Sequence, residues 1–179
     1  MRIASRVAGF LIGVSLTLSS AAAAQTPETE MVVIEGAKNP ELIPEHLMWS
    51  SAFHTIAFLK EQSAVDGGPL ALLLSAISTS DAKLILTEAA EHKKRGAECD
   101  EKGRRIVRAI EAQGIEPLER AMKSNTLACR QALLDAVDRL LSRLSPEGRS
   151  ELVRWVLDER GKITVRVPKA DLAFFRQPR

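Results

Sequence analysis

Apolar residues recur every three or four positions through most of this chain, which is the spacing of amphipathic helices. The first such segment spans residues 44–63, and Pro44 suits its first turn. The side chains expected to face the core are Leu47, Met48, Ala52, Phe53, Ile56 and Leu59. The Gly67-Gly68-Pro69 sequence breaks this pattern, and a short apolar helix is expected over 70–77.

Two long helices are expected next, over 81–113 and 118–144, separated by Gly114 and Pro117. One stripe of the first helix advances by four and three residues alternately, as in a coiled-coil seam. Its members are Ile85, Ala89, His92, Gly96, Cys99, Gly103, Ile106 and Ile110. The second helix carries a matching stripe of Leu118, Met122, Thr126, Cys129, Leu133, Val137, Leu140 and Leu144. The sequence therefore predicts an antiparallel hairpin, in which the two Gly either allow close approach or kink the helix.

A last helix is expected over 146–160, with Ser145 as its N-cap. Its inward residues are predicted to be Leu152, Val153, Val156 and Leu157, with Trp155 near the rim. Residues 162–167 alternate as a strand does, and could pair with Met31–Ile34. Helix-forming residue types dominate and Tyr is absent. The predicted class is all-α, a helical bundle around a long antiparallel hairpin, with a short β-ribbon near the termini.

The N-terminus has the pattern of a bacterial secretory signal peptide. Arg2 and Arg6 precede an apolar run over 7–18, and small residues follow up to Ala24. We expect cleavage between Ala24 and Gln25, export to the periplasm and no membrane attachment of the mature chain; the alternative is a retained anchor. The expected division is a signal peptide (1–24), a mobile lead-in (25–43), one helical domain (44–167) and a tail (168–179).

The net charge carries little information about partners. The chain holds 25 basic and 23 acidic residues, and the first 24 residues contain two Arg and no acid. The mature chain is therefore balanced at 23 and 23, which gives no reason to expect nucleic acid as a partner.

Cys99 and Cys129 are the two cysteines, and both lie on the inward stripes of the predicted hairpin. An even number of cysteines in an exported protein favours a disulfide. We therefore expect a Cys99–Cys129 bond that joins the two long helices; the alternative is two buried free thiols.

Catalytic motifs are absent from the sequence: there is no nucleophile elbow, zinc-protease helix, phosphate loop or dinucleotide fingerprint. His46 and His54 are expected near the surface, about 12 Å apart along one helix. Glu88 and His92 are four residues apart and could share one cation, although a simple Glu–His pair is the plainer interpretation. No cofactor is predicted. The mixed charges around Glu101 are typical of a solvated helix face.

Two segments carry a resemblance to known proteins. Residues 144–168 (LSPEGRSELVRWVLDERGKITVRVP) and 39–49 (NPELIPEHLMW) resemble an uncharacterised group of small exported helical bacterial proteins. Leu144-Ser145-Pro146-Glu147 is also similar to the L-T-x-x-Q motif of periplasmic helical stress chaperones, but Ser145 replaces Thr and Gly148 stands where that motif has Gln. The first resemblance implies export and a helical fold, and no activity.

The function class that these observations favour is a non-enzymatic interaction or structural module of the periplasm. Its expected partner is a protein of the cell envelope, and the chain could also form a homodimer. Two alternatives stay open at this point. One is an envelope-stress chaperone or sensor, and the other is a metal-binding protein that uses Glu88 and His92.

Overall fold

The computed structural model describes residues 30–62 and 68–175. The predicted signal peptide and its Ala24–Gln25 cleavage site lie outside these residues. The helices are α1 (Glu45–Glu61), α2 (Pro69–Ser75), α3 (Thr79–Ile110), α4 (Ile115–Arg143), α5 (Pro146–Arg160) and α6 (Leu172–Phe175). Strands β1 (Met31–Glu35) and β2 (Thr164–Pro168) and the short 3-10 turns η1 (Pro40–Leu42), η2 (Glu111–Gln113) and η3 (Lys169–Asp171) complete the order. The predicted all-α bundle with a short β-ribbon is confirmed.

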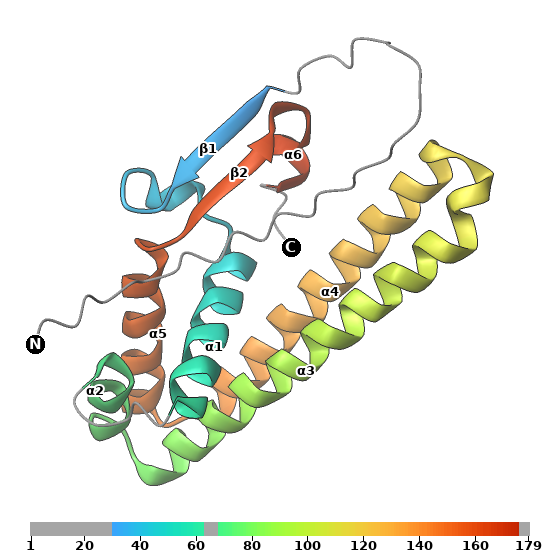
Figure 1. Ribbon diagram of the computed structural model, residues 1–179. Coiled ribbons are helices and arrows are strands. Elements are labelled where there is room, and N and C mark those ends of the chain that lie inside the picture. The colour runs from blue at the N-terminus through green and yellow to red at the C-terminus, as the bar shows by residue number, and fades with distance from the viewer. Residues whose placement is uncertain (1–29, 63–67, 176–179) are drawn as a thin grey trace, which may run out of the picture.

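Helices α3 and α4 run antiparallel and form a hairpin that extends well beyond α1 and α5 (Figure 1). The turn between them depends on Gly114, whose φ of 103° lies in the left-handed region that favours glycine. Helix α3 is continuous through Gly96 and Gly103, so neither glycine breaks it. None of the described helices is both long and apolar enough to cross a bilayer.

The main core lies where α1 packs between the base of the hairpin and α5. Phe53 and Ile56 of α1 are fully buried, together with Ile85 of α3, Val137 of α4 and Leu152 of α5. These are the residues whose helical spacing predicts burial, because a 3.6-residue period brings them to one face of each helix.

The sequence predicts Trp155 near the rim of the core and Leu157 facing inward, and the structure reverses these two positions. Trp155 is buried in the main core, whereas Leu157 is 44% exposed. Helix α5 contacts both α1 and α2, so its buried face is turned toward Trp155. A periodic pattern identifies a helix, but it does not reveal a second neighbour on one side of it.

The two strands pair antiparallel, with Met31 opposite Pro168 and Glu35 opposite Thr164. Their inner face, with Ile34 and Val167, forms a second apolar cluster with Ile43 and Phe175. The second cluster supplies the packing that a lone two-stranded ribbon needs. Residues 31–43 and 168–175, predicted as a mobile lead-in and a tail, therefore belong to the folded structure, because Ile34, Ile43 and Phe175 are buried in this cluster.

A buried carboxylate joins the starts of α3 and α5. Ser78 and Ser145 are the N-cap residues, and their hydroxyls accept hydrogen bonds from the backbone N–H groups of Asp81 and Gly148, respectively. The Asp81 carboxylate accepts from the Ser145 N–H (3.1 Å), the Ser145 hydroxyl (2.6 Å) and the Ser78 hydroxyl (2.9 Å). Asp81 thus supplies to α5 the acceptor that a capping box places within its own helix.

Gly148 makes room for this arrangement. A Cβ at Gly148 would lie 2.5 Å from the nearer Asp81 carboxylate oxygen. The carboxylate therefore occupies the space that an ordinary side chain at the third position of α5 would fill.

Candidate functional site

The part of the hairpin between the two cysteines, residues 99–129, is here called the distal arm. Figure 1 shows it reaching past the ends of α1 and α5. Of its residues, only Gly103 and Asn125 are buried. The arm's apolar side chains are instead partly exposed: Ile106, Val107, Ile110, Leu118 and Met122. Two facing helices cover only one stripe of each other, so an arm of this kind has little core of its own.

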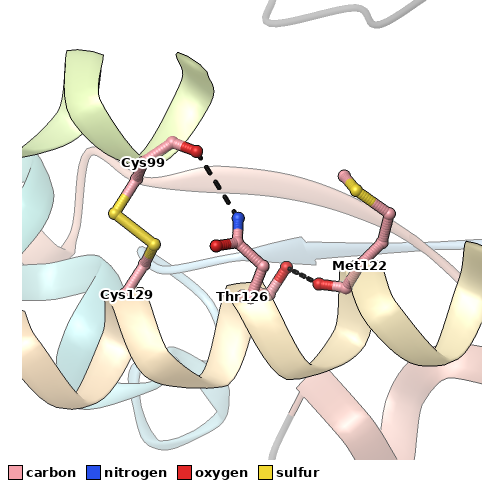
Figure 2. The surroundings of a disulfide bond; sticks show 5 residues. Cys99, Met122, Thr126 and Cys129 are labelled. Carbon is pink, nitrogen blue, oxygen red and sulfur yellow. Dashed lines mark hydrogen bonds between the residues drawn. A yellow bond between two sulfur atoms is a disulfide. The ribbon is translucent and has the colours of Figure 1, made fainter. Parts of the chain in front are cut away.

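A disulfide closes the base of the arm. Cys99 of α3 and Cys129 of α4 are bonded, with their Cα atoms 6.2 Å apart (Figure 2). The predicted proximity of the two cysteines is confirmed. The bond closes a 30-residue separation, for which the chain-entropy model gives about 3.5 kcal/mol of stabilisation. A covalent link therefore stabilises the arm where apolar burial is scarce.

Polar contacts next to the disulfide fix the register of the two helices. The Asn125 side-chain amide donates to the Cys99 carbonyl oxygen (3.4 Å), across the helix pair. On α4 itself, the Thr126 hydroxyl donates to the Met122 carbonyl oxygen at 3.0 Å (Figure 2). A buried Asn between two helices favours one alignment over its neighbours.

The small-residue stripe of α3 behaves differently at its two glycines. At Gly103 a Cβ would lie 3.5 Å from the Met122 methyl carbon, so α4 does approach α3 closely there. At Gly96 nothing lies within 4 Å of that point, and the residue is exposed. The prediction that Gly96 belongs to the inward stripe is therefore wrong, although Cys99 and Gly103 farther along the stripe do face α4.

Charged groups on the arm's outer face pair with one another. Glu101 accepts hydrogen bonds from Arg104, Arg105 and Arg108, all along α3. Those bonds, with Arg104 first, hold the pKa of the Glu101 carboxyl below its usual value. The mixed-charge segment is thus an ion-paired, solvated helix face, as its spacing predicts.

Glu88 and His92, the candidate metal ligands, each bond to a different residue. Glu88 forms an ion pair with Arg95. His92 is buried, and its Nε2 lies 3.2 Å from the Ser50 hydroxyl of α1. Its ring also packs on Phe53, with the centroids 5.7 Å apart. Within residues 30–62 and 68–175, no three His, Cys, Asp or Glu side chains gather as a metal site would need.

Two histidines are buried and uncharged near neutral pH. Burial, with the nearby positive charge of Arg95 and the ring of His54, lowers the pKa of His92 to about 4. Burial and Arg130 lower the pKa of His46 to about 4 as well. The prediction of an exposed His46 is wrong: the residue is buried, at the start of α1 where Leu47 and Met48 pack on the apolar cluster of the β-ribbon and Phe175. The exposed position predicted for His54 is confirmed.

Arg130 fastens the base of the arm to the C-terminal segment. Its guanidinium donates to the Phe174 carbonyl oxygen (3.0 Å) and lies 4.6 Å from the centre of the Phe174 ring. Arg130 follows Cys129 directly in the sequence. The disulfide and the cation–π contact therefore stabilise the same part of the hairpin. No periodic pattern predicts this contact, because the two residues are 44 positions apart.

Comparison of the chain with protein-family models, with curated proteins and with solved structures finds no match.

Proposed function

We propose that this protein is a non-enzymatic interaction module of the bacterial periplasm, and that its distal arm docks a protein of the cell envelope. The observation that supports this is the contrast between the two halves of the hairpin. The base packs Ile85 and Val137 into the main core, whereas the arm buries only Gly103 and Asn125.

The arm offers a partner apolar surface that is already ordered. Ile115 at its tip is 78% exposed and Leu127 on α4 is 39% exposed. Burying a large aliphatic side chain contributes about 1.5–3 kcal/mol. The disulfide reduces the entropy that binding would otherwise cost, because the two helices are already joined.

Export is part of the proposal. The signal-like N-terminus supports passage into an oxidising compartment, and a Cys99–Cys129 disulfide suits such a compartment.

The test is site-specific photo-cross-linking in living cells, followed by mass spectrometry of the attached proteins. One probe replaces Ile115 at the arm tip, and the control probe replaces Ser150 on the exposed side of α5. One discrete envelope protein attached through Ile115 and absent from the Ser150 sample is the expected result. Attachment to a second copy of the chain would assign a homodimer to the same arm.

Two results would count against the proposal. A broad set of unfolded envelope proteins would favour the chaperone alternative. Attachment at Ser150 but not at Ile115, or no attachment at either position, would show that the arm is not the docking element.

A further inference from the structure

A groove of about 640 Å³ lies at the base of the hairpin, away from the distal arm. Its walls come from the beginning of α3 and the end of α4. The polar side chains that line it are Ser80, Lys83 and Thr87 of α3, and Arg139, Ser142 and Arg143 of α4.

The spacing of these residues places them on one face of each helix. Ser80, Lys83 and Thr87 follow one another by three and four residues, as neighbours on a helix surface do. Arg139 and Arg143 are four residues apart on the facing helix. Because α3 and α4 pack side by side, cations and hydroxyls face the groove from both walls.

The positive charge in the groove is not neutralised by ion pairs. Lys83, Arg139 and Arg143 take part in no ion pair with another residue that the structure describes. The one carboxylate that lines the groove, Glu88, is bonded to Arg95. Like charges held together repel one another, so an anion that enters the groove would relieve that repulsion.

We propose that this groove binds a small molecule that carries a phosphate group and a short apolar part. The three cations and the Thr87 hydroxyl provide more donors than the two oxygens of a carboxylate can accept, whereas a phosphate monoester has three terminal oxygens and about two charges. The Ser142 hydroxyl donates to the Arg139 carbonyl oxygen, and the Ser80 hydroxyl bonds to that of Ser78. Leu84 and Leu140 also line the groove, and its volume is typical of small-molecule sites rather than of a bare ion.

Isothermal titration with hexyl phosphate tests this, with inorganic phosphate and hexanol as separate probes. Hexyl phosphate is expected to bind at least about tenfold more tightly than either of them, because only it carries both parts. Equal affinity for hexyl phosphate and inorganic phosphate would overturn the apolar part of the proposal. Absence of binding at millimolar hexyl phosphate would overturn all of it.

A matched pair of triple variants separates the groove from general charge. The groove variant is K83Q/R139Q/R143Q, and the control is K94Q/K102Q/K123Q, which removes the same charge from exposed sites on the same two helices. The groove variant should lose at least about tenfold in affinity while the control stays within about twofold. Equal losses in both variants would overturn the proposal.

Flotation with vesicles identifies the source of the phosphate. If phosphatidic acid vesicles, whose headgroup is a phosphate monoester, bind the control variant but not the groove variant, the phosphate belongs to a lipid headgroup. If hexyl phosphate binds and the vesicles do not, it belongs to a free molecule. Either result supports the shared chemistry, whereas vesicle binding by both variants would place lipid contact elsewhere and overturn the lipid source.

Discussion

Removal of the buried Asp81 carboxylate should destabilise the protein by breaking the contact between the starts of α3 and α5. The carboxylate is 3% exposed and accepts three hydrogen bonds, two from Ser145 and one from Ser78. These bonds, led by the Ser145 hydroxyl, keep the pKa of Asp81 below its usual value although burial opposes them. Asp81 therefore stays ionised at neutral pH, and its contribution is lost only as the pH falls below the ordinary carboxyl range.

The cost of Asp81→Ala follows from the bonds that it breaks. A hydrogen bond to a charged group contributes about 1.5–3 kcal/mol, and an N–H left without a partner costs about 1–3 kcal/mol. The terms are not additive, so we expect a loss of about 3 kcal/mol in the free energy of unfolding. For a domain of this size that is a fall of about 6–12 °C in Tm.

Urea denaturation followed by far-UV circular dichroism measures this loss. Asp135→Ala is the control, because Asp135 is exposed and accepts a hydrogen bond from the exposed Gln131. The control should change stability by less than about 0.5 kcal/mol. A loss below about 1 kcal/mol in Asp81→Ala would refute the reasoning.

A second substitution, Gly148→Ala, tests directly whether the Asp81 carboxylate fills the space beside α5. Gly148→Ala should destabilise the wild-type chain by about 1–3 kcal/mol, because the new Cβ would lie 2.5 Å from the Asp81 carboxylate oxygen. In the Asp81→Ala background the same change should cost at least about 1 kcal/mol less, since only the Cβ of residue 81 remains, at 3.1 Å, and Ala is a better helix former than Gly. The same effect in both backgrounds would show that Asp81 does not fill the space beside Gly148.

Three further predictions concern the arm, a buried histidine and a glycine. A C99S/C129S variant should lose about 3.5 kcal/mol of stability, and denatured, unreduced wild-type protein should show no free thiol. With the pKa of His92 near 4 when folded and 6.5 when unfolded, its contribution to stability should be complete above pH 6.5 and fall by about 2 kcal/mol toward pH 4, after allowance for partial solvent access. His46 titrates over the same range, so urea titrations of His92→Gln should lose about half of the total slope, while His54→Gln keeps all of it. Gly96→Ala should raise the urea midpoint, by about 0.5–1 kcal/mol in stability, because the residue is exposed and helical; a fall would contradict the absence of neighbours there.

Several elements could be predicted because their determinants are local. Ser145-Pro146-Glu147 marks the start of α5, and Gly114 marks the turn of the hairpin, since caps and left-handed turns depend on a few adjacent residues. The β-ribbon could be anticipated because β2 alternates polar and apolar residues and β1 contains consecutive Val and Ile, which favour strands.

The candidate site was only partly accessible to such reasoning. Cys99 and Cys129 lie on two stripes whose antiparallel alignment follows from the position of the turn. The groove around Lys83 and Arg143 was missed, because its two walls carry no motif and become a site only when α3 packs on α4.

The sequence by itself determined the helices, their caps, the hairpin, the ribbon and the cysteine pair, because periodicity and capping act over a few residues. Tertiary structure alone decided which partner each polar group has. It brings Asp81 to the N-cap of a helix 64 residues away, turns His92 to Ser50 rather than to Glu88, and buries His46 in the first turn of α1. The physical reason is that a polar side chain bonds to whatever lies nearest when the helices pack, and the helical period carries no information about those neighbours.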